Sequence, residues 1–145
     1  MVQNLSHCIH ASCVALDGRG LLIRGASGSG KSALSLQLMA YGAQLVADDR
    51  VLLTLNGGSV VARPPKATAG LIEARGLGIL HAENTAQAAV CAIVDLDRLA
   101  DGRLPAQSAE TILGLDLPVI HRVEATHFAP ALLQYLKCGA LNPDA

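Results

Sequence analysis

A short glycine-rich segment limits the possible folds of this chain more than any other feature. It reads Gly25-Ala26-Ser27-Gly28-Ser29-Gly30-Lys31-Ser32 and matches G-x-x-x-x-G-K-[ST], the phosphate-binding P-loop. An apolar run at 20–24 precedes it, and helix-forming residues follow it. In such a loop the glycines let backbone N–H groups turn inward on a phosphate, and the next helix presents its positive end. The motif therefore predicts phosphate binding in an α/β fold.

Each position of the loop has a predicted role. Gly25, Ala26, Ser27, Gly28, Ser29 and Gly30 form the nucleotide-binding backbone, with Lys31 on the β- and γ-phosphates and Ser32 on Mg²⁺. Residues 28–33 also satisfy G-x-G-x-x-A, and Asp48 follows at the distance expected in a dinucleotide-binding fold. That interpretation is disfavoured, because a dinucleotide site does not need the Lys31-Ser32 pair.

Composition narrows the classes of partner. With 145 residues and a mass of 14.9 kDa, the chain fits a single domain spanning 1–145, and we expect a flexible tail at 139–145. One Phe, two Tyr and no Trp provide no stacking platform for single-stranded nucleic acid. A formal charge of -1 provides no basic field for a duplex. We therefore expect no nucleic-acid partner.

The N-terminus and the apolar runs indicate a cytoplasmic location. Residues 1–7 lack the basic start and the apolar run of a secretory signal. Charged residues interrupt every apolar run before it reaches the roughly 18 residues that cross a bilayer. The scattered cysteines have no C-x-x-C spacing, so we expect reduced thiols and not a zinc site.

Gly and Pro residues divide the chain into predicted elements. We expect a mixed β-sheet around a strand–P-loop–helix unit with flanking helices, as in P-loop kinases. Strands are predicted at 10–16, 20–24, 44–47, 88–96 and 117–123, with a hairpin formed by 51–55 and 59–62. Helices are predicted at 31–41, closed by Gly42, and at 130–137, ended by Gly139.

Two adjacent carboxylates end the strand after the first helix. A parallel strand–helix–strand crossover places the carboxyl ends of its strands at one edge of the sheet, so Asp48 and Asp49 should lie beside the P-loop. Neighbouring strand residues point to opposite sides, which predicts different tasks for the two carboxylates. One would take a proton, and the other would support the metal or Lys31. An ordinary solvated strand end fits this stretch equally well.

The segment 72–79 is unusual for a core strand, because it holds an acid, a base and two glycines in an apolar frame. The glycines suggest a close approach of the backbone to a ligand. Glu73 would supply a second Mg²⁺ carboxylate, and Arg75 would contact a phosphate. A surface ion pair is the alternative.

These segments together resemble one known family. The P-loop, the strand end 45–49 and the sequence Glu73-Ala74-Arg75-Gly76-Leu77-Gly78-Ile79 occur in the order and spacing of the HPr kinase/phosphorylase family. The resemblance spans roughly 10–123 and concerns that family's C-terminal catalytic domain. It implies an enzyme that uses ATP and Mg²⁺ to phosphorylate a serine of HPr, a phosphocarrier of the sugar phosphotransferase system. It also implies a homo-oligomer, specifically a hexamer.

The resemblance assigns roles to individual residues. Asp49 matches the catalytic acid/base and His10 a catalytic-site histidine, while Lys31 and Ser32 match the P-loop lysine and the metal-binding serine. The metal set then comprises Ser32, Glu73 and Asp48, with Arg75 on the nucleotide. The family's further catalytic arginine is assigned to Arg103, in Gly102-Arg103-Leu104.

Two departures from the family pattern bear on activity. Longer members carry an N-terminal domain, whereas this sequence begins almost at His10. The stretch 117–124 lacks the Pro-Gly-Arg-Asn pattern tied to phosphate removal, so the kinase activity is better supported than the phosphorylase activity. The alternatives are a small-molecule P-loop kinase, for which no Arg-rich lid is evident, and a nucleotide-responsive module that binds HPr without transferring phosphate.

Overall fold

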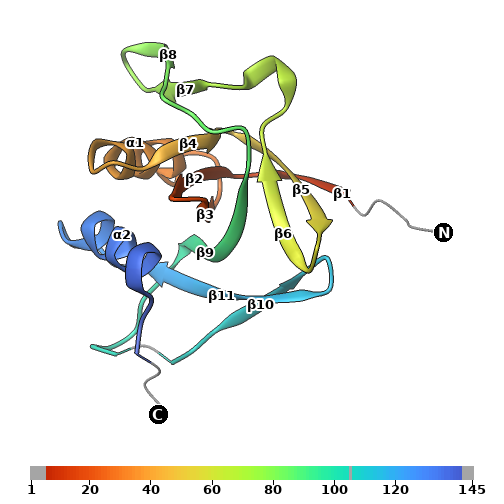
Figure 1. The fold of residues 1–145 in the computed structure, drawn as a ribbon. Coiled ribbons are helices and arrows are strands. Elements are labelled where there is room, and N and C mark those ends of the chain that lie inside the picture. Colours follow the sequence, from red (N-terminus) through yellow and green to blue (C-terminus); the bar gives the residue numbers. More distant parts are fainter. Residues whose placement is uncertain (1–5, 105, 142–145) are drawn as a thin grey trace.

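The computed structural model describes residues 6–104 and 106–141, which form a large curled β-sheet with its helices on one side (Figure 1). The strands are β1 Ser6–His10, β2 Ser12–Leu16, β3 Arg19–Arg24, β4 Gln44–Ala47, β5 Arg50–Asn56, β6 Ser59–Arg63, β7 Leu71–Ala74, β8 Gly78–His81, β9 Ala88–Leu99, β10 Ala109–Ile112 and β11 Leu115–Arg122. The helices are α1 Lys31–Ala40 and α2 Phe128–Cys138, with a 3-10 turn at Lys66–Thr68.

The main sheet places the P-loop strand at its centre. Its order is β1-β5-β6-β9-β3-β2-β4, and β11 joins through β9 while β10 pairs with β11. Strand β9 runs parallel to both β3 and β11. The carboxyl ends of these three strands therefore meet at one edge, which is where ligands bind in open α/β sheets. Strands β7 and β8 form a separate hairpin that extends past α1 in Figure 1.

Two apolar cores fix this arrangement. One lies between the sheet and the helices, where Leu38 of α1 and Leu132 of α2 pack with Leu21 and Ile23 of β3. The other lies inside the curl of the sheet, where Leu22 of β3 packs with side chains of β5 and β6. Neighbouring residues of β3 thus enter different cores, as the period of a strand requires. Strands covered on both faces have continuous apolar sequences, which explains the run in β9.

The predicted fold class is confirmed, and most predicted elements are present. Helix α1 ends at Ala40, and Gly42 follows with a φ of 111° in the left-handed region. The single strand expected at 10–16 is wrong, because Ala11 separates β1, which pairs with β5, from β2, which pairs with β3 and β4. Strand β10, which is short and of mixed polarity, was not predicted.

The crossover around α1 differs from the simplest expectation. It does return a strand parallel to β3, but β2 lies between β3 and β4 and is antiparallel to both. Of the tail predicted at 139–145, residues 142–145 lie outside the described residues, and Gly139 to Leu141 follow α2 without regular structure. Among the described residues, no helix has the length and apolar character needed to cross a membrane.

Candidate phosphate-binding and catalytic site

The P-loop joins β3 to α1 and closes around its own lysine. Gly30 caps the helix with a φ of 104°, a left-handed conformation that favours glycine. A Cβ on Gly25 would lie 2.5 Å from Ser29 Oγ, so this position also requires glycine. Lys31 is only 7% exposed, and its Nζ donates to the carbonyl oxygens of Gly25, at 2.8 Å, and Ala26, at 3.1 Å. The loop therefore holds its ammonium group at the centre of a backbone cradle.

Asp48 lies beside the loop, and its buried carboxylate accepts hydrogen bonds from three different elements. It is 6% exposed, and its Oδ1 accepts hydrogen bonds from Ser12 Oγ and Ser32 Oγ, each at 2.7 Å. Its Oδ2 accepts the backbone N–H of Glu73 at 3.0 Å. One carboxylate thus joins β2, the start of α1 and β7. Asp48 sets the position of the Ser32 hydroxyl and of the backbone that carries Glu73.

Asp49 has a different environment from its neighbour. Its φ of 68° lies in the left-handed region, which Asp tolerates better than most residues. Arg50 N donates to Asp48 O at 2.8 Å, which closes a three-residue turn, and Ala11 N donates to Asp49 O at 3.2 Å. The turn leaves the Asp49 side chain 66% exposed, with Oδ1 2.8 Å from His10 Nε2. The expected divergence of the two carboxylates is present, and its cause is this turn and not strand alternation.

A cavity of about 550 Å³ brings most of the predicted catalytic and metal-binding residues together, but Asp48 does not line it. Lys31, Ser32, His10, Asp49 and Glu73 all line it, and so does Arg75.

The β7–β8 hairpin forms one wall of this cavity and supplies Glu73 and Arg75. Gly76, with a φ of 87°, makes its turn. A Cβ placed on Gly76 or on Gly78 would meet no atom within 4 Å. These glycines therefore shape the hairpin, and within the described part of the chain no other group approaches them closely.

The residues of the cavity fit a magnesium ion that is shared with phosphates. The Ser32 hydroxyl and the Glu73 carboxylate line the same cavity, and both offer the hard oxygen atoms that Mg²⁺ prefers. Within the described ranges, no group of three or more His, Cys, Asp or Glu side chains is positioned to hold a metal. Mg²⁺ in nucleotide sites uses one or two protein groups and completes its shell with phosphate oxygens and water.

Arg103 is not brought into this cavity. It is exposed in the loop between β9 and β10, and it is absent from the cavity lining. The structure of this single chain therefore gathers His10, Asp49 and Lys31 and leaves the fourth predicted catalytic residue apart.

Known proteins share both the sequence and the fold of this site. A family model described as the HPr Serine kinase C-terminal domain matches residues 3–92, which include every residue of the cavity. The chain belongs to this family. The resemblance seen in the sequence is thereby confirmed.

Named relatives and a solved structure agree with the family. The HPr kinase/phosphorylase of Clostridium beijerinckii is 44% identical over 72 residues, or 50% of this chain and 24% of that protein. That of Malacoplasma penetrans is 38% identical over 74 residues, or 51% of this chain and 25% of that protein. The chain thus matches about a quarter of the length of these curated relatives. The structure of the Hpr(Ser) kinase/phosphatase from Coxiella burnetii matches with a TM-score of 0.75 and 26% identity, covering 90% of this chain and 88% of that chain.

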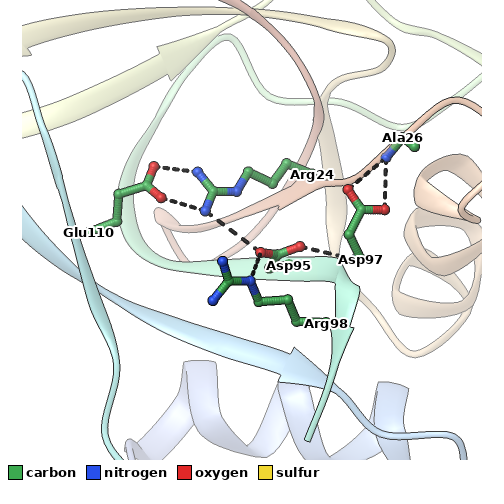
Figure 2. A network of polar contacts seen from close by, with 6 residues as sticks. All are labelled: Arg24, Ala26, Asp95, Asp97, Arg98 and Glu110. Carbon is green, nitrogen blue, oxygen red and sulfur yellow. Dashed lines mark hydrogen bonds and ion pairs between the residues drawn. The ribbon is translucent and has the colours of Figure 1, made fainter.

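A second polar network, centred on Asp95 and Asp97 of β9, supports the P-loop of this HPr kinase-type domain (Figure 2). Both oxygens of Asp97, in β9, accept the backbone N–H of Ala26, at 3.0 and 3.1 Å. Asp97 N in turn donates to Asp95 Oδ1 at 2.9 Å. Asp95 Oδ2 lies 3.8 Å from Arg24 Nη2 and 3.9 Å from Arg98 Nε. Ala26, the first variable residue of the P-loop motif, is thus hydrogen-bonded to the end of β9.

The network also reaches β10. Arg24 donates through both terminal nitrogens to the carboxylate of Glu110, a bidentate pair (Figure 2). The hydrogen bonds from Arg24 lower the pKa of Glu110 below its ordinary value, and the same bonds raise the pKa of Arg24. The pair thereby connects the P-loop strand to the β10–β11 hairpin.

Sequence reasoning missed this network. The available signal was Val94-Asp95-Leu96-Asp97, where acidic residues end a continuous apolar strand. A strand buried on both faces that ends in alternating carboxylates indicates an edge of the sheet where polar contacts are made. Glu110 carried no such signal, because its partner Arg24 is 86 residues away in the chain.

Proposed function

We propose that this protein is an ATP- and Mg²⁺-dependent serine kinase whose acceptor is an HPr-type phosphocarrier protein. The observation that carries the proposal is the placement of Asp49, at 2.8 Å from His10, in the same cavity as Lys31 and Ser32. A proton acceptor, a phosphate-binding lysine and metal-binding oxygens are the groups that phosphoryl transfer requires. The names of the relatives favour HPr as the acceptor.

In the proposed reaction Asp49 orients the serine hydroxyl and accepts its proton as the γ-phosphoryl group is transferred in line. The hydrogen bond to His10 fixes the Asp49 carboxylate in the exposed position where an acceptor protein can reach it. Lys31 and the loop amides bind the phosphate oxygens and offset the charge that develops during transfer. Arg75 lines the same cavity and binds a phosphate oxygen.

Ser32 and Glu73 are the proposed ligands of Mg²⁺, which when bound neutralises phosphate charge. Asp48 is assigned a supporting role, because its carboxylate already accepts three hydrogen bonds, from Ser12, Ser32 and Glu73. With about four lone-pair sites on a carboxylate, a single site remains for a metal-bound water. Asp48 would therefore act on the metal mainly through Ser32.

The wider role is regulation of phosphotransferase signalling in the cytoplasm, by a homo-oligomer of this chain. Arg103 stays assigned as a catalytic arginine by the family resemblance alone, because it does not line the cavity of its own chain. Phosphate removal has less support, because residues 117–124 lack the pattern that accompanies it.

Transfer of the labelled γ-phosphoryl group of ATP to HPr tests the proposal. Wild type should yield phosphoserine on HPr in the presence of Mg²⁺, and Lys31→Ala should form it about a hundredfold or more slowly. Lys137→Ala, at an exposed position near the end of α2, is the matched control and should retain activity. If ATP binds but HPr stays unlabelled with wild type, the protein is a nucleotide-responsive binding module or acts on another acceptor, and the proposal is wrong.

A further inference from the structure

The end of β9 contacts the start of the P-loop at two successive residues. The parallel pairing of β3 with β9 ends where the loop begins. Just beyond it, a Cβ on Gly25 would lie 3.2 Å from Leu96 Cβ, so the two segments approach each other closely. Both carboxylate oxygens of Asp97 then accept the backbone N–H of Ala26, at 3.0 and 3.1 Å (Figure 2). The Asp97 side chain therefore continues the contact between the two segments after the strand pairing has ended.

The peptide unit between Gly25 and Ala26 is hydrogen-bonded at both ends. Its N–H belongs to Ala26 and donates to Asp97. Its carbonyl oxygen belongs to Gly25 and accepts from Lys31 Nζ at 2.8 Å. A trans peptide is planar and its N–H and C=O groups point in opposite directions, so a bond that fixes one group also aims the other. An anionic acceptor and a cationic donor at the two ends polarise the unit, which strengthens both hydrogen bonds.

The amide held by Asp97 is separate from the amides that α1 offers to a phosphate. Helix α1 begins at Lys31, and its first backbone bond into the preceding turn runs from Leu34 N to Gly30 O at 2.9 Å. The N–H groups just before Leu34 have no partner within the helix and can bind phosphate oxygens. Ala26 precedes this set, so Asp97 does not compete with a phosphate for its amide.

Asp97 is itself held in place by a neighbouring carboxylate. Its N–H donates to Asp95 Oδ1 at 2.9 Å. The Asp95 side chain is 13% exposed, and its other oxygen lies near the guanidinium groups of Arg24 and Arg98 (Figure 2). Because its backbone is fixed in this way, Asp97 presents its carboxylate to the loop at a lower cost in conformational entropy.

We propose that Asp97 is a positioning residue for phosphoryl transfer, which acts on Lys31 through this peptide unit. The inference rests on the proposed function and adds to it a residue outside the reacting groups, because Asp97 does not line the cavity that contains Asp49. The loop requires a hydrogen-bond acceptor at this position. It does not require the negative charge, which is unfavourable near a bound polyphosphate. The transfer rate should therefore depend on Asp97, whereas nucleotide binding by the amides of α1 should depend on it little.

Two substitutions at Asp97 separate the hydrogen bond from the charge. Asp97→Asn removes the charge and retains an oxygen that can accept the Ala26 N–H, whereas Asp97→Ala removes both. Asp101→Ala, in the exposed loop after β9, is the matched control. Single-turnover transfer from Mg-ATP to HPr and the calorimetric affinity for Mg-ATP would be measured for the full chain of wild type and each variant.

Asp97→Ala should transfer phosphate about tenfold more slowly than wild type, because a small displacement of a catalytic group has a large effect on rate. Its affinity for Mg-ATP and its binding stoichiometry should equal those of wild type, which also shows that the variant is folded. Asp97→Asn and Asp101→Ala should match wild type in both measurements. The inference is overturned if Asp97→Ala transfers at the wild-type rate, if Asp97→Asn is as slow as Asp97→Ala, or if the rate and the Mg-ATP affinity of Asp97→Ala fall together.

Amide hydrogen exchange of the protein without nucleotide tests the positioning separately from the function. The Ala26 N–H should exchange faster in Asp97→Ala than in wild type, and Asp97→Asn should retain the protection. Equal exchange in wild type and Asp97→Ala would overturn the inference. If wild type transfers no phosphate to HPr, the proposed function fails, and the exchange rates alone decide whether Asp97 holds the loop.

Discussion

The two sides of the P-loop differ in how they are built. The larger cavity, of about 550 Å³, is lined mainly by charged and hydroxyl-bearing residues, and all of its lining residues lie within the family match at 3–92. A smaller cavity, of about 240 Å³, lies between the start of α1, the end of β9 and the connection from β11 to α2, and takes much of its wall from Leu96, Val123, Ala125 and Phe128, which lie beyond that match. The fold nevertheless corresponds over 90% of the chain. The chemistry proposed for the first side demands particular residue types in short sequence motifs, whereas the wall of the second side is assembled from residues without such a motif.

The largest effect should follow from removing the cation at the centre of the loop. Lys31→Ala removes a buried ammonium group that the loop carbonyls orient, and charge stabilisation of this kind is typically worth about 10²–10³ in rate. We expect HPr phosphorylation to fall by about a hundredfold or more, measured at fixed Mg²⁺ and saturating ATP. Activity close to that of wild type would show that the first side does not carry the chemistry.

The next largest effect concerns stability on the same side. Asp48→Asn leaves an amide group where three donors from β2, α1 and β7 need an acceptor. We expect the free energy of unfolding to fall by about 2–3 kcal/mol in urea titrations. Asp101→Asn, in the exposed loop after β9, should stay within about 0.5 kcal/mol of wild type. An equally small effect of Asp48→Asn would contradict the claim that its carboxylate stabilises the junction of β2, α1 and β7.

The pair of Arg24 and Glu110, in the polar network at the end of β9, should respond more weakly and with a distinct pH dependence. Glu110→Gln breaks the pair with Arg24 and should cost about 0.5–1 kcal/mol at neutral pH, because both side chains are partly exposed. Arg24 lowers the pKa of Glu110 in the folded state, so the pair's stabilisation is complete above the ordinary carboxyl pKa. It is lost as the pH falls through the lowered value.

Urea unfolding of wild type and Glu110→Gln, repeated from neutral pH into acid, measures this dependence. The two unfolding free energies should converge in acid. A difference that stays constant over the whole series would mean that the pair contributes by packing and not by charge.

The last prediction involves no change in stability. It concerns how fast the buried and the exposed cysteine thiols of the native protein react. Burial raises the pKa of the Cys13 thiol to about 12, so it stays protonated inside the curl of the sheet. Cys8 and Cys138 are exposed. A thiol reagent at mildly alkaline pH should modify these two in the native protein and Cys13 only after unfolding. Fast modification of Cys13 would show that the core beneath the site opens readily.

The first side could largely be predicted from the sequence. The P-loop, the Asp48-Asp49 pair and the segment around Glu73 are short runs in which each residue type has a chemical reason. A strand–helix–strand crossover then sufficed to place Asp48 beside Ser32, although the position of β2 between β3 and β4 was not anticipated. The turn that separates the two carboxylates depends on a positive φ at Asp49, which no local pattern predicts for an aspartate.

The smaller cavity and the polar network around Arg24 could not be predicted, because their contacts join distant residues of ordinary type. Phe128 approaches the P-loop only through the packing of α2 on the sheet, and Glu110 meets Arg24 only through the pairing of β10 and β11. The predicted strand at 10–16 failed for a similar reason. The segment before Ala11 pairs with β5, and the segment after it pairs with β3 and β4. Strand pairing depends on the whole sheet and is not set by the local sequence.

The role of Asp49 is the central claim, and single-turnover transfer from ATP to HPr by Asp49→Asn tests it most directly. The variant should bind Mg-ATP with wild-type affinity, because Lys31 and Ser32 are intact, and should transfer phosphate about 10²–10⁴ times more slowly, the range expected for loss of a general base. Asp101→Asn should match wild type. Transfer by Asp49→Asn at the wild-type rate would contradict the account.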